Sequence, residues 1–234
     1  MTATLPPGDE LLDHPDADPA SVRESLHHIA RSNRWFGGWW AVRRGLARLC
    51  AGIPRGTELT LLDLGTGSGD LPVLAARWAA RRGLGLRALG LERHRTAARL
   101  ASGRGIPTLL AAVPEIPART ASVDIVLASQ LLHHLAPPVI AALCREASRV
   151  ARRGVVMADL RRSPLALAGF WAGSRLLGFD RSTRADGITS VQRGFTREVL
   201  AAHLAAIGAD ARVEHSPGFR LVATWQTGRP ACER

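Results

Sequence analysis

The fold is decided by the stretch Leu61-Leu62-Asp63-Leu64-Gly65-Thr66-Gly67-Ser68-Gly69-Asp70. An apolar run ends in an acid, three glycines follow at every second position, and Leu71-Pro72 opens a helical pattern. This order predicts a buried strand, a tight loop and a helix N-terminus, because glycine lets the backbone turn sharply and lets a ligand approach it closely. A plain strand-to-helix turn has the same pattern, so the rest of the chain must distinguish the two.

The length and composition indicate one domain with appendages and a substantial core. The chain has 234 residues, of which 46% are hydrophobic. The acids Asp9, Glu10 and Asp13 stand where a secretory signal carries basic residues. The longest apolar run, roughly 165–173, is shorter than the about 20 residues that span a bilayer. We therefore expect a cytoplasmic protein without a membrane span.

The charge is strongly basic, with a formal net charge of +11. All 31 basic residues are arginine, and they are scattered along the chain instead of forming one tract. A solvated basic surface is therefore preferred over nucleic-acid binding. The three cysteines, Cys50, Cys144 and Cys232, are too far apart for metal-ligand spacing, so we expect no metal site. Cys50 and Cys144 have apolar helical surroundings typical of core thiols in a reducing compartment.

Strands and helices are expected to alternate after residue 57. Five segments have strand character with helical patterns between them: 59–64, 86–92, 107–112, 123–129 and 154–158. Two more, 211–215 and 220–225, resemble a closing antiparallel pair. The alternation predicts an α/β fold with a doubly wound, mostly parallel sheet.

Four regions are expected along the chain. They are an N-terminal helical lid (1–56), a cofactor-binding core (57–162), a helical and irregular insertion that caps the substrate (163–194), and the last helix with the closing strands (195–234). Residues 1–18 and 226–234 are expected to be a loose lead-in and a frayed tail. Aromatic side chains concentrate in the lid and the insertion, where they either pack on the core or wall a cavity for a flat, apolar acceptor: Trp35, Trp39, Phe170 and Trp171.

Three features fall at the carboxyl ends of the predicted strands, where an open α/β sheet binds ligands. They are the glycine loop, Glu92 at the tip of the second strand, and the segment 124–134. A carboxylate at that tip suits both hydroxyls of a ribose, and a glycine turn suits a closely approaching charged group. Together they predict a nucleoside-containing cofactor. The glycine spacing departs from the dinucleotide pattern Gly-x-Gly-x-x-Gly, and the chain has no triphosphate loop ending in Gly-Lys-Ser/Thr.

The same residues resemble the motifs of class I S-adenosylmethionine-dependent methyltransferases. Residues 63–69 are similar to the family's first motif, Leu91-Glu92 to its ribose-binding acid, and 123–135 to the strand-four motif of its small-molecule branch. The resemblance covers about residues 57–160 and implies a Rossmann-like sheet. Less specifically, 34–38 and 159–163 resemble bacterial methyltransferases of polyketide, phenolic-lipid and quinone pathways.

The resemblance implies S-adenosylmethionine as the cofactor. Its methionine part would be held by Asp63 and the loop residues Gly65, Thr66, Gly67 and Gly69, and its ribose by Glu92. Ala112 stands where the family often has an Asp for the adenine amino group. Adenine would then be held by backbone groups, apolar packing or Glu115. The expected cofactor site also includes Ala112, Val113 and Ser129.

Methyl transfer to a phenol requires removal of a proton with a pKa of about 10, and a histidine with a pKa of about 6.5 is suited to that step. His133 and His134 follow the fourth strand, and we expect one of them, preferably His133, to be the general base. The alternative is that the pair packs and hydrogen-bonds the loop. Asp159 would orient the acceptor, and Arg161 with Arg162 would meet an acidic group on it or be ordinary surface charge.

The predicted function is methylation of a small aromatic or polyketide-like acceptor, preferably at a phenolic oxygen, in secondary metabolism. Three alternatives remain: C-methylation of a quinol-like ring, nucleic-acid methylation, and a cofactor-binding protein or cyclase without transfer activity. Base methylation is disfavoured because Ser129-Gln130-Leu131-Leu132 stands where an Asn/Asp-Pro-Pro-aromatic motif would be. Monomer and homodimer both remain open.

Overall fold

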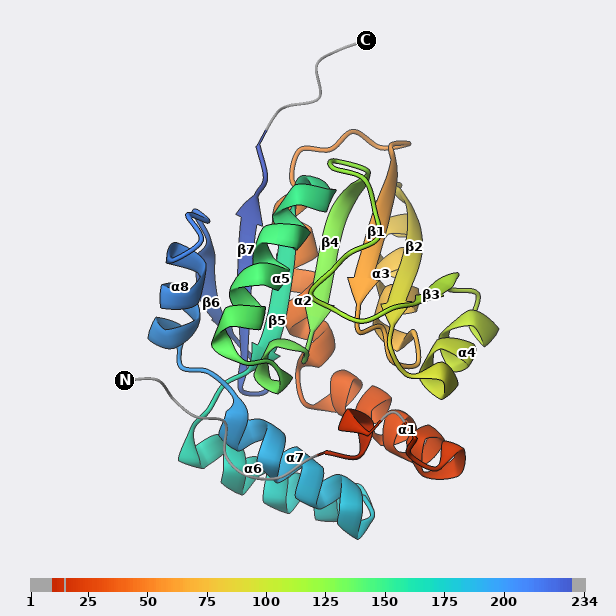
Figure 1. Cartoon of the computed structure of the whole chain (residues 1–234), viewed down its shortest axis with the longest axis vertical. Helices are drawn as coiled ribbons and strands as arrows, with labels where there is room; N and C mark the ends of the chain where they lie inside the picture. Colours follow the sequence, from red (N-terminus) through yellow and green to blue (C-terminus); the bar gives the residue numbers. More distant parts are fainter. Residues whose placement is uncertain (1–9, 15, 229–234) are drawn as a thin grey trace.

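The structure, a computed structural model, describes residues 10–14 and 16–228 and contains one seven-stranded sheet (Figure 1). The strand order is β3-β2-β1-β4-β5-β7-β6, and only β7 pairs antiparallel with its neighbours. The strands are β1 (Glu58–Leu64), β2 (Gly85–Glu92), β3 (Thr108–Leu110), β4 (Val123–Ser129), β5 (Ala151–Leu160), β6 (Arg212–Ser216) and β7 (Arg220–Gln226). The predicted doubly wound, Rossmann-like sheet with an antiparallel closing pair is confirmed.

Helices cover both faces of the sheet, because side chains along the central strands alternate between two apolar cores. On one face, α2 (Gly38–Leu49) and α3 (Asp70–Ala80) pack over Leu61, Ile125 and Val156. On the other face, α5 (Pro137–Val150) and α8 (Arg197–Ala205) pack over the alternate residues of the same strands. The helix α4 (Arg95–Gly103) lies beside β3.

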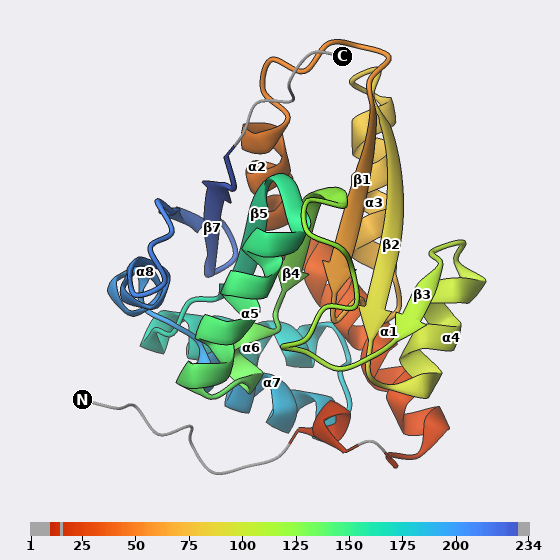
Figure 2. The ribbon, with the colours of Figure 1, turned by 45° about the horizontal axis from the view of Figure 1, so that its top comes forward.

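A third group of helices lies beyond the carboxyl ends of the parallel strands (Figures 1 and 2). It contains α1 (Pro19–Trp35), α6 (Pro164–Leu176) and α7 (Arg181–Arg193), with the short 3-10 helices η1 (Leu11–Asp13) and η2 (Leu132–His134) beside them. Within the expected N-terminal lid, α2 therefore belongs to a helical layer of the sheet, whereas η1 and α1 cover the strand ends.

The second half of the segment 163–194 differs from the irregular chain that the sequence predicts, because residues 181–193 form α7. Its Thr, Asp, Gly and Ser residues have weak helix propensity. The helix is started by Asp180, whose carboxylate accepts from the Thr183 amide at 3.0 Å, and it packs on α6 through Gly187 against the Phe170 ring. Capping and tertiary packing therefore override local propensity here.

Several expectations concern burial and the ends of the chain. Cys144 is buried and Cys50 half-buried, and both are free thiols; Cys232 lies outside the described residues. Of the expected lead-in, residues 11–13 are helical, while 1–9 and the tail residues 229–234 lie outside the described part. None of the helices in the described ranges has the length and apolar character needed to cross a bilayer.

Candidate active site

The glycine loop between β1 and α3 forms one wall of a cavity of about 280 Å³ at the carboxyl ends of the strands. Gly65 and Gly67 line the cavity with φ angles of +66° and +55°, which residues with a side chain rarely adopt. The Gly65 amide donates to the Leu91 carbonyl at 2.8 Å, and the Gly67 amide donates to Glu92 Oε2 at 2.9 Å. The loop is thereby held against the end of β2.

Two buried carboxylates lie beside the loop. Asp63 accepts a hydrogen bond from the Thr66 hydroxyl at 2.8 Å, and Glu92 accepts from the amides of Gly67 and His94, each at 2.9 Å. Burial raises the pKa of Asp63 to about 8, although the Thr66 hydrogen bond acts in the opposite direction. A positively charged ligand group would lower this pKa again, so the wall favours a cationic ligand.

His133 in η2 pairs with Asp159 near the end of β5. Its Nδ1 lies 2.6 Å from Asp159 Oδ1, and the two side chains are only 2% and 1% exposed. Asp159 also accepts from the amides of Leu132 at 2.9 Å and Leu160 at 2.7 Å. Burial acts to raise the pKa of Asp159, but the charge and hydrogen bond of His133 outweigh it and hold the pKa below its usual value. Asp159 therefore stays ionised and keeps a proton on His133 Nδ1.

The other ring nitrogen of His133 is available to a ligand. Nε2 is buried and has no hydrogen-bond partner among the described residues, and His133 lines the cavity. A neutral imidazole with its proton fixed on Nδ1 presents a lone pair on Nε2. The dyad can therefore take a proton from a hydroxyl bound in the cavity.

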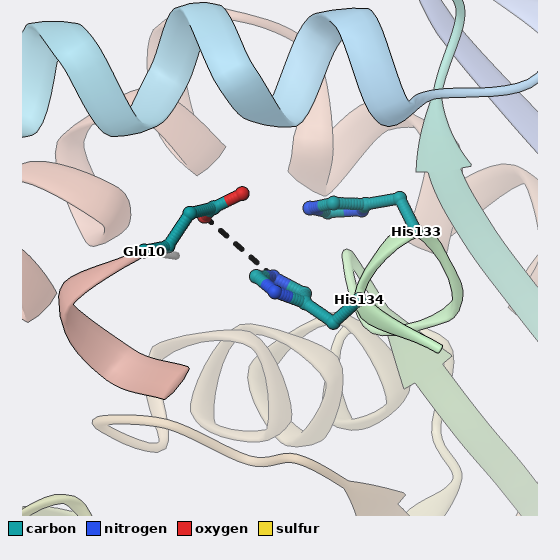
Figure 3. Close-up of side chains that lie close together, drawn as sticks. All are labelled: Glu10, His133 and His134. Carbon is teal, nitrogen blue, oxygen red and sulfur yellow. Dashed lines mark ion pairs between the residues drawn. The ribbon is translucent and has the colours of Figure 1, made fainter. Parts of the chain in front are cut away.

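His134 contacts the N-terminal segment. Asp13 Oδ1 lies 3.2 Å from its Nδ1, and Glu10 Oε2 lies 3.8 Å from its Nε2; Figure 3 shows the Glu10 carboxylate facing both imidazole rings. Donor atoms of Glu10, His133 and His134 lie within 4.8 Å of one another, and these residue types can bind a divalent cation. Glu10 also has a counter-charge in the protein itself, because Arg193 Nη1 lies 3.6 Å from its Oε1.

A row of hydrogen-bonded side chains lines the cavity from β7 to α3. Arg220 Nη1 donates to Gln130 Oε1 at 2.9 Å, Gln130 Nε2 to Asn33 Oδ1 at 2.5 Å, and Asn33 Nδ2 to Asp70 Oδ2 at 3.0 Å. Arg220 Nε donates to the Phe36 carbonyl at 3.0 Å. Burial lowers the pKa of Arg220 to about 10. The row fixes the α1–α2 turn and thus the position of α1 over the cavity.

The structure brings most of the predicted cofactor residues together in the lining of this cavity: Asp63, Gly65, Thr66, Gly67, Glu92, Ala112, Val113 and Ser129. Gly69 lies outside the lining. It precedes α3 with a φ of +76°, and a Cβ there would come within 3.1 Å of Ala101, so helix packing accounts for this glycine. Glu115 is exposed and also lies outside the lining, whereas Ala112 and Val113 offer backbone and apolar contacts.

The predicted acceptor residues are more dispersed. Phe170 lines the cavity, and Asp159 stands behind His133. Like Asp159, four others lie outside the lining of this cavity: Trp35, Trp39, Arg161 and Trp171. Trp35 and Trp171 face solvent, Trp39 packs against the core under α2, and Arg161 contacts His215 Nδ1 at 2.9 Å. The sequence shows that aromatic residues cluster but not which face of a helix meets the cavity.

The sequence-based predictions miss the cavity residues that come from the chain ends and from α1: Glu10, Asp13, Asn33 and Arg220. Arg220 had one signal, since it is a lone charge at the head of the apolar strand β7. For Glu10 and Asp13 the sequence offers no indication of a place in the cavity besides their charge. They stand in a segment that is interpreted from the sequence as a loose lead-in.

The comparisons with known proteins agree with this geometry. The family described as a methyltransferase domain matches residues 62–158. Among curated protein sequences, none matches the chain. The plantazolicin methyltransferase BpumL in complex with SAH is 12% identical with a TM-score of 0.68, covering 94% of each chain. A SAM-dependent methyltransferase from Aquifex aeolicus is 14% identical with a TM-score of 0.61, covering 90% of this chain and 99% of that one. Magnesium protoporphyrin IX methyltransferase from Synechocystis PCC 6803 with bound SAH is 13% identical with a TM-score of 0.55, covering 89% and 99%.

The residues of the cavity fit S-adenosylmethionine. The Glu92 carboxylate at the tip of β2 suits its ribose hydroxyls, and the glycine backbone allows close approach of its methionine part. The acids Asp63 and Asp70 suit its two cationic groups, because burial raises the pKa of each carboxyl and a nearby cation offsets that cost. Residues 62–158 match a methyltransferase domain, and the chain as a whole has the fold of S-adenosylmethionine-dependent methyltransferases.

Proposed function

We propose that the enzyme methylates a hydroxyl oxygen of a small aromatic or polyketide-like acceptor, a phenolic oxygen above all, in cytoplasmic secondary metabolism. The observation that carries this proposal is the His133–Asp159 dyad, with a contact of 2.6 Å and a free Nε2 at the cavity. A phenol needs such a base because its pKa of about 10 leaves it protonated at neutral pH.

The apolar side chains that line the cavity favour a flat, apolar acceptor. Helices α1, α6 and α7 contribute apolar side chains to it: Leu26, Ile29, Phe170 and Val191, with Phe179 from the α6–α7 link. A covered cavity lined in this way suits a small molecule better than a nucleic-acid strand, which needs an open basic groove.

Each residue has a role in the proposed reaction. S-adenosylmethionine, when bound, supplies a methyl group that its sulfonium already activates. Asp63, the glycine loop and Glu92 would hold this cofactor. His133 would accept the acceptor's proton on Nε2, and Asp159 would hold the ring in place and stabilise the imidazolium that forms. Alignment of the two reactants accounts for much of the rate.

The test compares His133→Gln with His134→Gln in the full chain. Turnover of a panel of phenols is followed by mass spectrometry for the gain of one methyl group, and binding of S-adenosylhomocysteine is measured by calorimetry. We expect His133→Gln to keep binding and to lose turnover by about 10²–10⁴-fold. If both variants keep full turnover, the base proposal is wrong.

C-methylation of a quinol-like ring is supported by the same dyad, because removing a phenolic proton also makes the ring carbon nucleophilic. Locating the new methyl group by NMR separates the two outcomes: a methoxy signal supports oxygen transfer and an aryl-methyl signal supports carbon transfer.

A further inference from the structure

The solvent face of α6 is apolar, whereas a helix that contacts water usually presents polar residues there. Leu165 and Leu176 are 70% and 88% exposed, and Trp171 is 53% exposed. The positions between the two leucines on the same face are also exposed and carry only small residues: Ala168, Gly169 and Ala172. Large apolar side chains gathered on one exposed face mark an interaction site.

The end of α1 packs on α6 and adds one exposed aromatic side chain. The Phe36 ring packs against Gly173 and lies 6.0 Å from the Phe170 ring, measured between centroids. Trp35, directly before Phe36, is 65% exposed. We define the α6 face as Trp35, Leu165, Trp171 and Leu176 with the small residues between the leucines. Figures 1 and 2 show α6 in the group of helices at the outer end of the molecule.

The surroundings of the α6 face are positively charged. Residues 161–179 contain three arginines and no Asp or Glu, and exposed Arg34 precedes Trp35. The guanidinium carbon of Arg175 lies 3.8 Å from the centroid of the Trp171 ring. Tryptophan favours the headgroup level of a bilayer, leucine favours the region just below it, and arginine favours anionic headgroups.

We propose that the α6 face docks the enzyme on the surface of an anionic lipid bilayer, with α6 lying in the interface without crossing it. A second copy of this chain is a poorer occupant, because a two-fold contact would face the arginines around the α6 face with the same arginines of the other copy and supply no acidic partner from residues 161–179. Since Phe170 of the same helix lines the active-site cavity, the bilayer would lie one helix away from the bound acceptor.

The experiment measures co-sedimentation of the full chain with vesicles of phosphatidylcholine alone and of phosphatidylcholine with phosphatidylglycerol. We expect binding to the anionic vesicles, weakened by high salt, and little binding to the neutral ones. Leu165→Glu/Leu176→Glu is expected to reduce the coefficient of partition between vesicles and water at least about tenfold. The double substitution removes two apolar side chains, and the anionic headgroups repel the two new carboxylates.

The matched control is Leu109→Glu/Val199→Glu, which makes the same charge change at exposed apolar positions on β3 and α8. It is expected to bind vesicles like the unchanged chain. Quenching of tryptophan fluorescence by brominated lipid, reduced in Trp35→Phe/Trp171→Phe, gives a second readout if the glutamate variant folds poorly. The proposal is overturned if the chain binds neither vesicle, if both glutamate pairs reduce binding equally, or if light scattering shows a dimer that Leu176→Glu dissociates and no vesicle binding.

Discussion

Replacing Asp159 with asparagine tests the central contact of the active site. The carboxylate accepts three hydrogen bonds: from His133 Nδ1 and the Leu160 amide at Oδ1, and from the Leu132 amide at Oδ2. An asparagine offers one oxygen and one NH₂ group, so it cannot accept on both sides. In either orientation of the amide, at least one buried backbone N–H loses its acceptor.

The magnitude follows from these contacts. An unsatisfied buried N–H costs about 1–3 kcal/mol, which corresponds to roughly 2–12 °C in the melting temperature of a chain this size. If the amide NH₂ faces His133, the imidazole must accept on Nδ1 and carry its proton on Nε2, where it cannot take another. In the other orientation Nδ1 keeps its proton, but the neutral amide stabilises the imidazolium less well than the carboxylate does. In both orientations we expect kcat to fall, by about 10²–10⁴-fold.

The assay combines calorimetric unfolding, binding of S-adenosylhomocysteine and turnover, with Asp210→Asn as the control because Asp210 is an exposed acid. Cofactor binding is expected to persist in Asp159→Asn, because Asp159 lies behind His133 and away from the glycine loop. The reasoning is refuted if Asp159→Asn melts and turns over like the control, or if it loses cofactor binding and turnover in the same proportion.

Three further predictions concern the cofactor wall and the histidine cluster. Glu92→Gln is expected to weaken S-adenosylhomocysteine binding about ten- to hundredfold by calorimetry, through loss of charged hydrogen bonds, and an unchanged affinity would contradict the assignment of Glu92 to the ribose. The pKa of Asp63 is raised to about 8 in the folded chain, above its unfolded value of about 3.9, so folding is favoured below the unfolded value and stability falls as pH rises towards the folded one. Asp63→Asn should flatten this slope in urea unfolding of the cofactor-free chain, and an unaltered slope would show that Asp63 is not its source. Dialysis against EDTA is expected to leave turnover and melting temperature unchanged, because Arg193 already lies 3.6 Å from Glu10 Oε1; activity lost with EDTA and restored by Zn²⁺ would instead make Glu10, His133 and His134 ligands.

The parallel sheet was predictable because its signals are local. Apolar runs of strand length alternate with helical periodicity, and glycine and acid residues stand at strand ends. The strand ends of a parallel sheet meet at one edge, so Asp63, Glu92 and Ser129 could be placed in one site before any contact was known. The helix α7 was missed because its stability comes from the Asp180 cap and from packing on α6 instead of from propensity.

The sequence by itself determined the order of strands, loop and helices, the class of cofactor, and the position of His133 directly after the fourth strand. Each of these depends on residues close together in the chain. Only the tertiary structure decided that Asp159 orients His133, that Glu10 faces His134, and that Arg220 lines the cavity. Those contacts join segments far apart in sequence, and strand register and helix docking bring them within hydrogen-bond reach. The same packing turned Phe170 into the cavity and left Trp171, its neighbour in the chain, on the surface, because adjacent residues of a helix point in different directions.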